Sequence, residues 1–205
     1  MKDIIRNIKI ALLNKKIILI VMISIIFLGL LFGSIYITIL DNKSKEDLMN
    51  NVSIYFNSYK DYTFSNKISI FKDTFIKDLI YFLLLWASGI SIIGMPIIFI
   101  MNFYKSFILG FSIGSIFAKY KILGLFKILV YIFPCKLLIL VLSIIMGSYG
   151  VNLSLKLISY CFRKKSLNFN IFMGKYLFIF IISILICILD SLLEAFINPL
   201  IYNII

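Results

Sequence analysis

The sequence predicts an all-α protein, a polytopic integral membrane helix bundle of about five spans with short amphipathic helices at the membrane surface. Hydrophobic residues make up 62% of its 205 residues, and the mean hydropathy is +1.07. A soluble domain has only about half apolar residues. The net charge of +12 comes from basic residues that flank apolar runs, as in proteins held at lipid headgroups rather than on nucleic acid. We therefore expect a single membrane domain over residues 1–205, in contact with the lipid bilayer.

The first forty residues predict a surface helix followed by a span. Residues 1–16 place apolar side chains on one helical face and basic ones elsewhere, which is typical of an amphipathic helix on the cytoplasmic membrane surface. Residues 17–40 supply the roughly 20 apolar residues that a bilayer core requires. Gly29 and Gly33 in this span form a G-x-x-x-G pattern, which lets a second helix approach closely.

Residues 41–78 form the only long polar stretch, and its six basic and six acidic residues leave it nearly neutral. Apolar side chains still recur at helical spacing within it. They form two stripes: Leu48, Val52, Tyr55, Phe56 and Tyr59, then Ile68, Phe71 and Phe75. Two short amphipathic helices would explain the stripes, as would a loop whose aromatic side chains fold back on the protein.

The middle of the chain predicts a second span over 79–101, with a kink near Pro96, because proline removes a helix hydrogen bond. Residues 102–118 are harder to assign. Between Lys105 and Lys119 the apolar run is about 20 Å long as a helix, too short to span. Either the helix starts near Met101 and Lys105 anchors it at the inner interface, or the segment is a broken, re-entrant hairpin.

Small residues recur one helical turn apart in this segment, at Gly110, Gly114 and Ala118. Together they make one helix face nearly flat, so that another helix can pack closely against it. The pattern favours packing inside the fold, and an interface with a partner protein is the alternative.

The last third of the chain predicts an interfacial helix over 121–136, ended by Pro134, and then two spans over 137–159 and 176–197. Basic residues dominate the amino terminus and the loop between these two spans. The positive-inside rule then places both on the cytoplasmic side. Five spans leave the 41–78 segment and the carboxyl terminus outside.

Asp190 and Glu194 are the acids that lie within the last span, and their four-residue spacing puts them on one helix face. Intramembrane carboxylates are costly and are candidates for function. Lys136 lies at a similar depth, so we expect it to approach one of the two acids. A structural pair is one interpretation, and a proton or ion path is the other.

The composition gives no support for an enzyme. The chain has no histidine, and it lacks the G-x-S-x-G, H-E-x-x-H and P-loop motifs. Its three cysteines are isolated and read as apolar fillers. We accordingly expect no catalytic residues, no metal, no cofactor and no small-molecule substrate.

Five stretches of the chain form a recognisable set: GISIIGMPIIFI from Gly89, FYKSFILGF from Phe103, YIFP from Tyr131, SLKLI from Ser154 and EAFINP from Glu194. Together they resemble the stage II sporulation protein M family of endospore-forming bacteria. The resemblance implies a five-span protein without activity of its own, at the septum and the engulfing mother-cell membrane. It implies recruitment of two peptidoglycan-degrading partners, stage II sporulation proteins D and P, during forespore engulfment.

Three functional hypotheses follow from the sequence. The first is a non-enzymatic membrane scaffold for peptidoglycan hydrolases, which would contact its partners through the 41–78 segment and the glycine-bearing helix faces. The second is a transporter- or channel-like component with a path near Asp190 and Glu194. A membrane-embedded enzyme is the third, and the missing histidine makes it the weakest.

Overall fold

A computed structural model of the chain describes the backbone of residues 2–58, 64–132, 135–163 and 169–197. These residues are helical except for short connections at 40–41 and 91–93, and they contain no strand, which confirms the predicted all-α fold. The elements, in chain order, are α1 (Lys2–Ile39), α2 (Asn42–Ser58), α3 (Phe64–Ile90), α4 (Gly94–Ile132), α5 (Cys135–Arg163), α6 (Phe169–Leu192) and a single π-helical turn, η1 (Leu193–Ile197).

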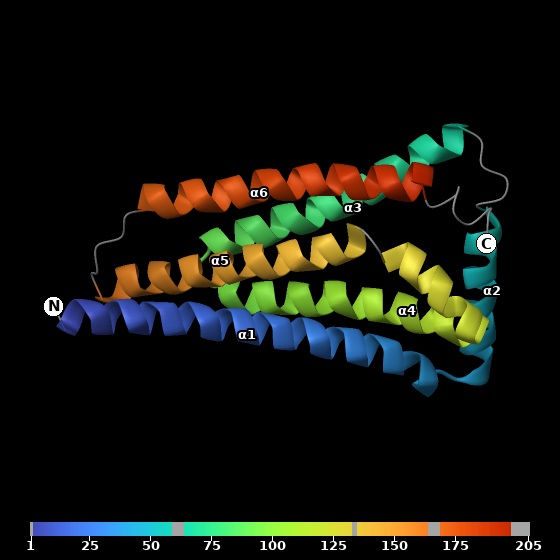
Figure 1. The fold of residues 1–205 in the computed structure, drawn as a ribbon, viewed down its shortest axis with the longest axis horizontal. Coiled ribbons are helices and arrows are strands. Elements are labelled where there is room, and N and C mark those ends of the chain that lie inside the picture. Colours follow the sequence, from blue (N-terminus) through green and yellow to red (C-terminus); the bar gives the residue numbers. More distant parts are fainter. Residues whose placement is uncertain (1, 59–63, 133–134, 164–168, 198–205) are drawn as a thin grey trace.

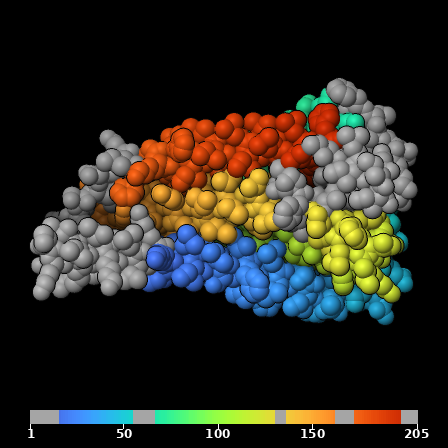
Figure 2. Space-filling view, in the orientation of Figure 1, coloured from blue at the N-terminus to red at the C-terminus, as the bar shows by residue number. Residues whose placement is uncertain are grey.

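Five helices run along the long axis of the molecule, and α2 stands across one end of them (Figure 1). The amino terminus lies at the opposite end, and successive lengthwise helices run in alternating directions. Seen from the same side, α1, α5 and α6 lie along an elongated body (Figure 2). Among the described residues, parts of α1, α4, α5 and α6 are long and apolar enough to cross a membrane. With α3 as the fifth pass, the bundle agrees with about five spans.

The break between the second and third passes lies ten residues earlier than the sequence suggested. α3 ends at Ile90, residues 91–93 form a turn, and α4 begins at Gly94. Pro96 therefore stands in the first turn of α4, where its missing N–H has no helical acceptor to lose. A kink or break was expected near Pro96, and the structure has a break just before it, whereas the continuous 79–101 span is wrong.

Residues 102–118 lie inside α4, so both earlier interpretations of this segment, a start near Met101 and a re-entrant hairpin, are wrong. The real kink is at Lys121, whose φ of 49° is unusual for a residue other than glycine. After it, residues 122–132 form a separate helical stretch with exposed apolar side chains, including Ile122 and Phe126. An interfacial helix was expected over 121–136. Its predicted end at Pro134 lies outside the described residues.

The 41–78 segment contains one helix of its own rather than two. α2 accounts for the first part of it, and Leu48 and Met49 face a small gap also lined by Ile37 of α1 and Ala118 of α4. The second apolar stripe, which includes Phe71 and Phe75, belongs to the first half of α3. Val52 of the first stripe is half-buried on α2, whereas Tyr55, Phe56 and Tyr59 lie outside the described side chains. Similarly, the helix expected over 1–16 is continuous with the first span in α1.

The core of the bundle is assembled from α1, α3, α4, α5 and α6. Its most buried large side chains include Met22, Phe82, Ile98, Met146 and Tyr176. Tyr176 donates a hydrogen bond to the Leu85 carbonyl oxygen at 3.0 Å, which satisfies its hydroxyl inside the core. Large apolar side chains on the outer faces of the same helices are exposed, as expected where a bundle contacts lipid.

Candidate functional site: a glycine seam and a buried charge cluster

The four glycines singled out in the sequence all lie in a single helix crossing, where those of α1 pack against α4 and those of α4 pack against α1. A Cβ atom added to Gly110 would lie 2.8 Å from the Leu30 Cα, and one added to Gly29 would lie 2.8 Å from the Phe103 carbonyl oxygen. Real Cβ atoms do not approach other atoms so closely, so the two backbones pack at a distance that only glycine permits.

Gly33 and Gly114 extend this seam by one turn on each helix. Added Cβ atoms would lie 2.8 Å from the Phe111 nitrogen at Gly33 and 2.9 Å from the Ser34 carbonyl oxygen at Gly114. The glycine faces are thus occupied within the chain itself. Of the two roles considered for them, internal packing is the one present here.

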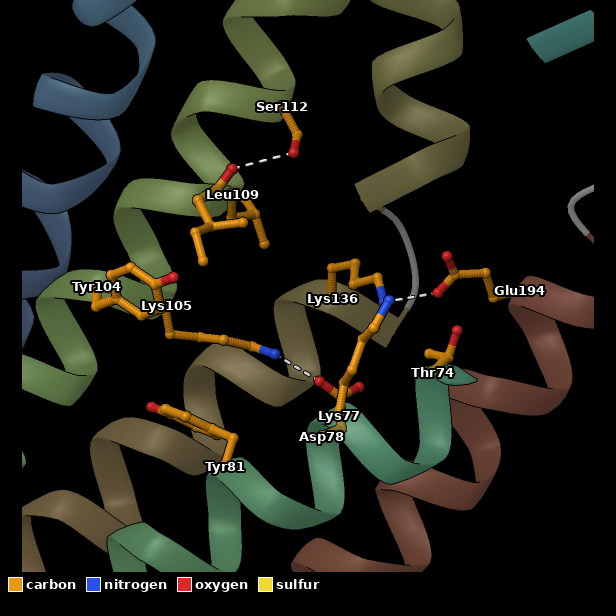
Figure 3. A pocket seen from close by; sticks show the side chains of 11 residues that line it. Thr74, Lys77, Asp78, Tyr81, Tyr104, Lys105, Leu109, Ser112, Lys136 and Glu194 are labelled. Carbon is orange, nitrogen blue, oxygen red and sulfur yellow. Dashed lines mark hydrogen bonds and ion pairs between the residues drawn. The ribbon is translucent and has the colours of Figure 1, made fainter. Parts of the chain in front are cut away.

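Lys136 pairs with both acids of the last span. Its Nζ atom lies 2.7 Å from Asp190 Oδ2 and 2.8 Å from Glu194 Oε2. The three side chains are largely shielded, with exposed fractions of 15%, 3% and 13% in that order. Lys136 lies in the first turn of α5, while Asp190 lies on α6 and Glu194 on η1. The approach predicted from depth alone is therefore present, and it connects α5 to the end of α6 (Figure 3).

A second buried ion pair joins α3 to α4, and the sequence reasoning missed it. Lys105 Nζ lies 2.5 Å from Asp78 Oδ1, and the Asp78 side chain is only 3% exposed. Lys105 follows Gly94 by eleven residues, about 16 Å along the helix. It consequently lies well inside the bundle, and the prediction that it anchors a helix end at the inner interface is wrong.

The signal that could have revealed this pair is the symmetry of the α3–α4 hairpin. Asp78 stands twelve residues before the end of α3, and Lys105 stands eleven residues after the start of α4. Equal helical distances from a turn bring two residues to the same depth on adjacent antiparallel helices. Placing the turn at 101 instead of 91–93 concealed this relationship.

The two ion pairs adjoin a cavity of about 450 Å³ towards the α2 end of the bundle. Figure 3 shows Lys105 and Lys136 reaching into this space from opposite sides, with Asp78 between them. The lining residues come from four elements and are Thr74, Lys77, Asp78, Tyr81, Tyr104, Lys105, Ile108, Leu109, Ser112, Lys136 and Glu194. Of the two acids of the last span, the cavity is lined by Glu194 but not by Asp190.

The cavity ends against polar and apolar packing on the side away from α2. Tyr81 donates to Asn102 Oδ1 at 3.4 Å, and Asn102, which is fully buried, donates to the Ile98 carbonyl oxygen at 2.9 Å. Beyond this pair lie buried core residues such as Phe82 and Met146. Within the described parts of the chain, no group of three or more histidines, cysteines and acids is placed to hold a metal ion.

Comparison with known proteins gives one decisive result. A family model described as Stage II sporulation protein M matches residues 18–199. The chain belongs to this family. No curated protein and no solved structure matches it significantly. The matched region contains the whole glycine seam and both buried ion pairs, and family membership makes the chain a sporulation-associated, multi-pass membrane protein.

Proposed function

We propose that the chain is a non-enzymatic membrane scaffold that recruits and holds peptidoglycan-degrading proteins during forespore engulfment. The proposal rests first on membership of the sporulation family. The partners in this proposal are stage II sporulation proteins D and P. Its site of action is the sporulation septum and then the engulfing mother-cell membrane, with the amino terminus in the cytoplasm.

The observation that favours assembly is the way α2 is held across one end of the bundle. Its apolar residues Leu48 and Met49 face α1 and α4, so the helix has a fixed position. The opposite face, which includes Glu46, Asp47 and Asn50, is exposed. Under the proposed topology this face lies on the side of the membrane where peptidoglycan is degraded, and it provides a rigid polar surface for a partner.

The glycine seam changes where partners are expected to bind. Gly29, Gly33, Gly110 and Gly114 pack within the α1–α4 crossing. We therefore no longer propose that a partner protein binds to those faces. α2 and residues 122–129 of the neighbouring stretch carry exposed side chains at that end of the molecule. We therefore assign the docking of hydrolases to the α2 end.

The transporter-like alternative is favoured by one observation, the charged cavity beside Lys136 and Glu194. Two observations argue against a transport path. Tyr81 and Asn102 pack at the inner end of the cavity, and Asp190 does not line the cavity. Affinity purification of the tagged full-length chain from sporulating cells, read by mass spectrometry, separates the two functions. Recovery of peptidoglycan hydrolases supports the scaffold, whereas recovery of a soluble nucleotide-binding ATPase in their place would establish a transporter subunit.

A further inference from the structure

A second cleft lies between α1, α5 and α6, towards the end of the bundle that contains the amino terminus. The start of α1, the end of α5 and the start of α6 lie at that end, opposite α2 (Figure 1). The cleft has a volume of about 150 Å³ and is lined by Leu19 of α1, Ser148, Tyr149 and Asn152 of α5, and Phe172 of α6. Its α5 wall is therefore polar, although all three helices are apolar enough here to cross a membrane.

Two of these polar side chains have hydrogen-bonding groups that the bundle does not use. Ser148 donates to the Ile144 carbonyl oxygen of its own helix at 2.6 Å. Within the described part of the chain, by contrast, the Asn152 amide and the Tyr149 hydroxyl form no hydrogen bond. Tyr149 is 38% exposed and Asn152 is half-buried, so neither is sealed in the core. Their donors are available to a molecule in the cleft.

The cleft lies just inside one surface of the membrane. The Ser154 hydroxyl of α5 lies 2.9 Å from the Ser91 carbonyl oxygen and 3.2 Å from the Ile92 carbonyl oxygen, both in the α3–α4 turn. Because backbone groups outside a helix need polar partners, a turn between two spans belongs at the headgroup level. Asn152 precedes Ser154 by two residues, about 3 Å along the helix. The cleft is thus level with lipid headgroups and the first part of the acyl chains.

Two lysines stand at the edge of the cleft. Lys16 lies three residues before Leu19 on α1, which is close to one helical turn. Lys156 comes from α5, and its Nζ atom lies 3.1 Å from the centre of the Phe172 ring. Both lysines therefore place positive charge beside the unused donors of the cleft. Basic pockets between membrane helices are suited to anionic lipid headgroups.

We propose that this cleft binds the headgroup of an anionic phospholipid of the phosphatidylglycerol type. The phosphate lies near Lys16 and Lys156 and accepts a hydrogen bond from the Asn152 amide, and the Tyr149 hydroxyl binds the hydroxyl-bearing part of the headgroup. The acyl chains continue along the exposed apolar faces of α1 and α6. This site is independent of the proposed scaffold function, since it lies at the end of the bundle away from α2.

The charges around the cleft select among headgroups. No acid occurs in residues 4–40 or 79–189, which contain every residue that lines the cleft. The cationic group of phosphatidylcholine or phosphatidylethanolamine would find no carboxylate there and would be repelled by the lysines. Phosphatidylglycerol has the same phosphate without that cation. Soluble glycerophosphoglycerol shares its polar chemistry, and the position of the cleft inside the membrane favours the lipid as the source.

The test uses the full-length chain, delipidated in detergent and titrated with short-chain phosphatidylglycerol, phosphatidylcholine or soluble glycerophosphoglycerol, with bound ligand counted by native mass spectrometry. We expect phosphatidylglycerol to bind more tightly than either alternative. Lys16→Gln should weaken its binding by about fivefold, the effect of one lysine at an anionic lipid surface. Lys72→Gln is the matched control, because Lys72 is an exposed lysine in the first half of α3 and does not line the cleft. Equal weakening by the two variants would overturn the site.

Asn152→Leu provides a second test that leaves every charge in place. Since Asn152 forms no hydrogen bond within the described residues, leucine should not lower the unfolding midpoint in detergent. It should weaken phosphatidylglycerol binding by about tenfold, the loss of one hydrogen bond to a charged group. Wild-type binding by a folded Asn152→Leu variant, or equal binding of phosphatidylglycerol and phosphatidylcholine by the unaltered chain, would contradict the proposal. Equally tight binding of soluble glycerophosphoglycerol would overturn the lipid as the ligand.

Discussion

Replacing Lys136 by methionine is the sharpest perturbation of the bundle, because it leaves two shielded carboxylates without their cation. Asp190 and Glu194 lose hydrogen bonds of 2.7 and 2.8 Å. Each charge-assisted bond contributes about 1.5–3 kcal/mol, and breaking a buried pair from one side costs about 3–5 kcal/mol. Since Lys136 is 15% exposed, we take the lower end. The expected loss is about 3 kcal/mol in the free energy of unfolding, or roughly 150-fold in the folded-to-unfolded ratio.

The assay is reversible unfolding in mixed detergent micelles, followed by circular dichroism. A triple variant, Lys136→Met with Asp190→Asn and Glu194→Gln, removes all three charges together and should cost less than Lys136→Met alone, because no isolated charge remains. Lys72→Met on the exposed part of α3 is the control for loss of a lysine. If Lys136→Met unfolds at the wild-type midpoint, or if the triple variant is as unstable as the single one, the cluster does not support the fold as argued.

Three further perturbations test other parts of the fold. Gly110→Ala should destabilise the α1–α4 crossing by about 1–3 kcal/mol through overpacking, whereas Gly174→Ala, where nothing lies within 4 Å, should not destabilise; equal unfolding midpoints would contradict the seam. Ser154→Ala removes hydrogen bonds of 2.9 and 3.2 Å to the Ser91 and Ile92 carbonyl oxygens, so amide exchange at 91–94 should accelerate, and unchanged exchange would refute this anchor. The hydroxyl and then the backbone N–H of Ser44 lower the pKa of Asp41 below 3.8. The Asp41 cap of α2 should therefore hold above pH 3.8 and be lost as the pH falls through that lowered pKa. If the protection of α2 amides from exchange does not change over this pH range, the cap is contradicted.

Asp41 illustrates the part of the structure that local sequence could have specified. It directly precedes α2, and an aspartate before a helix accepts hydrogen bonds from the first-turn N–H groups. The spans and the glycine spacing are likewise local patterns, and they were predictable from composition and periodicity. The approach of Lys136 to Asp190 was predictable because the two residues lie at similar depths in neighbouring spans.

The sequence alone did not identify which helix packs against the glycine faces or which residue pairs with Lys105. Both depend on where the helices end. Pro96 suggested a kink, yet proline at the start of a helix is equally favourable, and the sequence does not distinguish the two. Moving the break to 91–93 reassigns Lys105 from the membrane surface to a buried pair with Asp78. The kink at Lys121 has no local signal, since a lysine is an uncommon residue at positive φ.

The measurement that tests the central claim most directly is site-specific photo-crosslinking in sporulating cells. A photoreactive residue at Asn50, on the exposed face of α2, is compared with one at Tyr160, which is also exposed but lies towards the far end of α5. The account predicts that a peptidoglycan-degrading protein is captured from Asn50 and not from Tyr160. Capture from Tyr160 alone, or equal capture from both positions, would contradict the assignment of the α2 end as the docking surface.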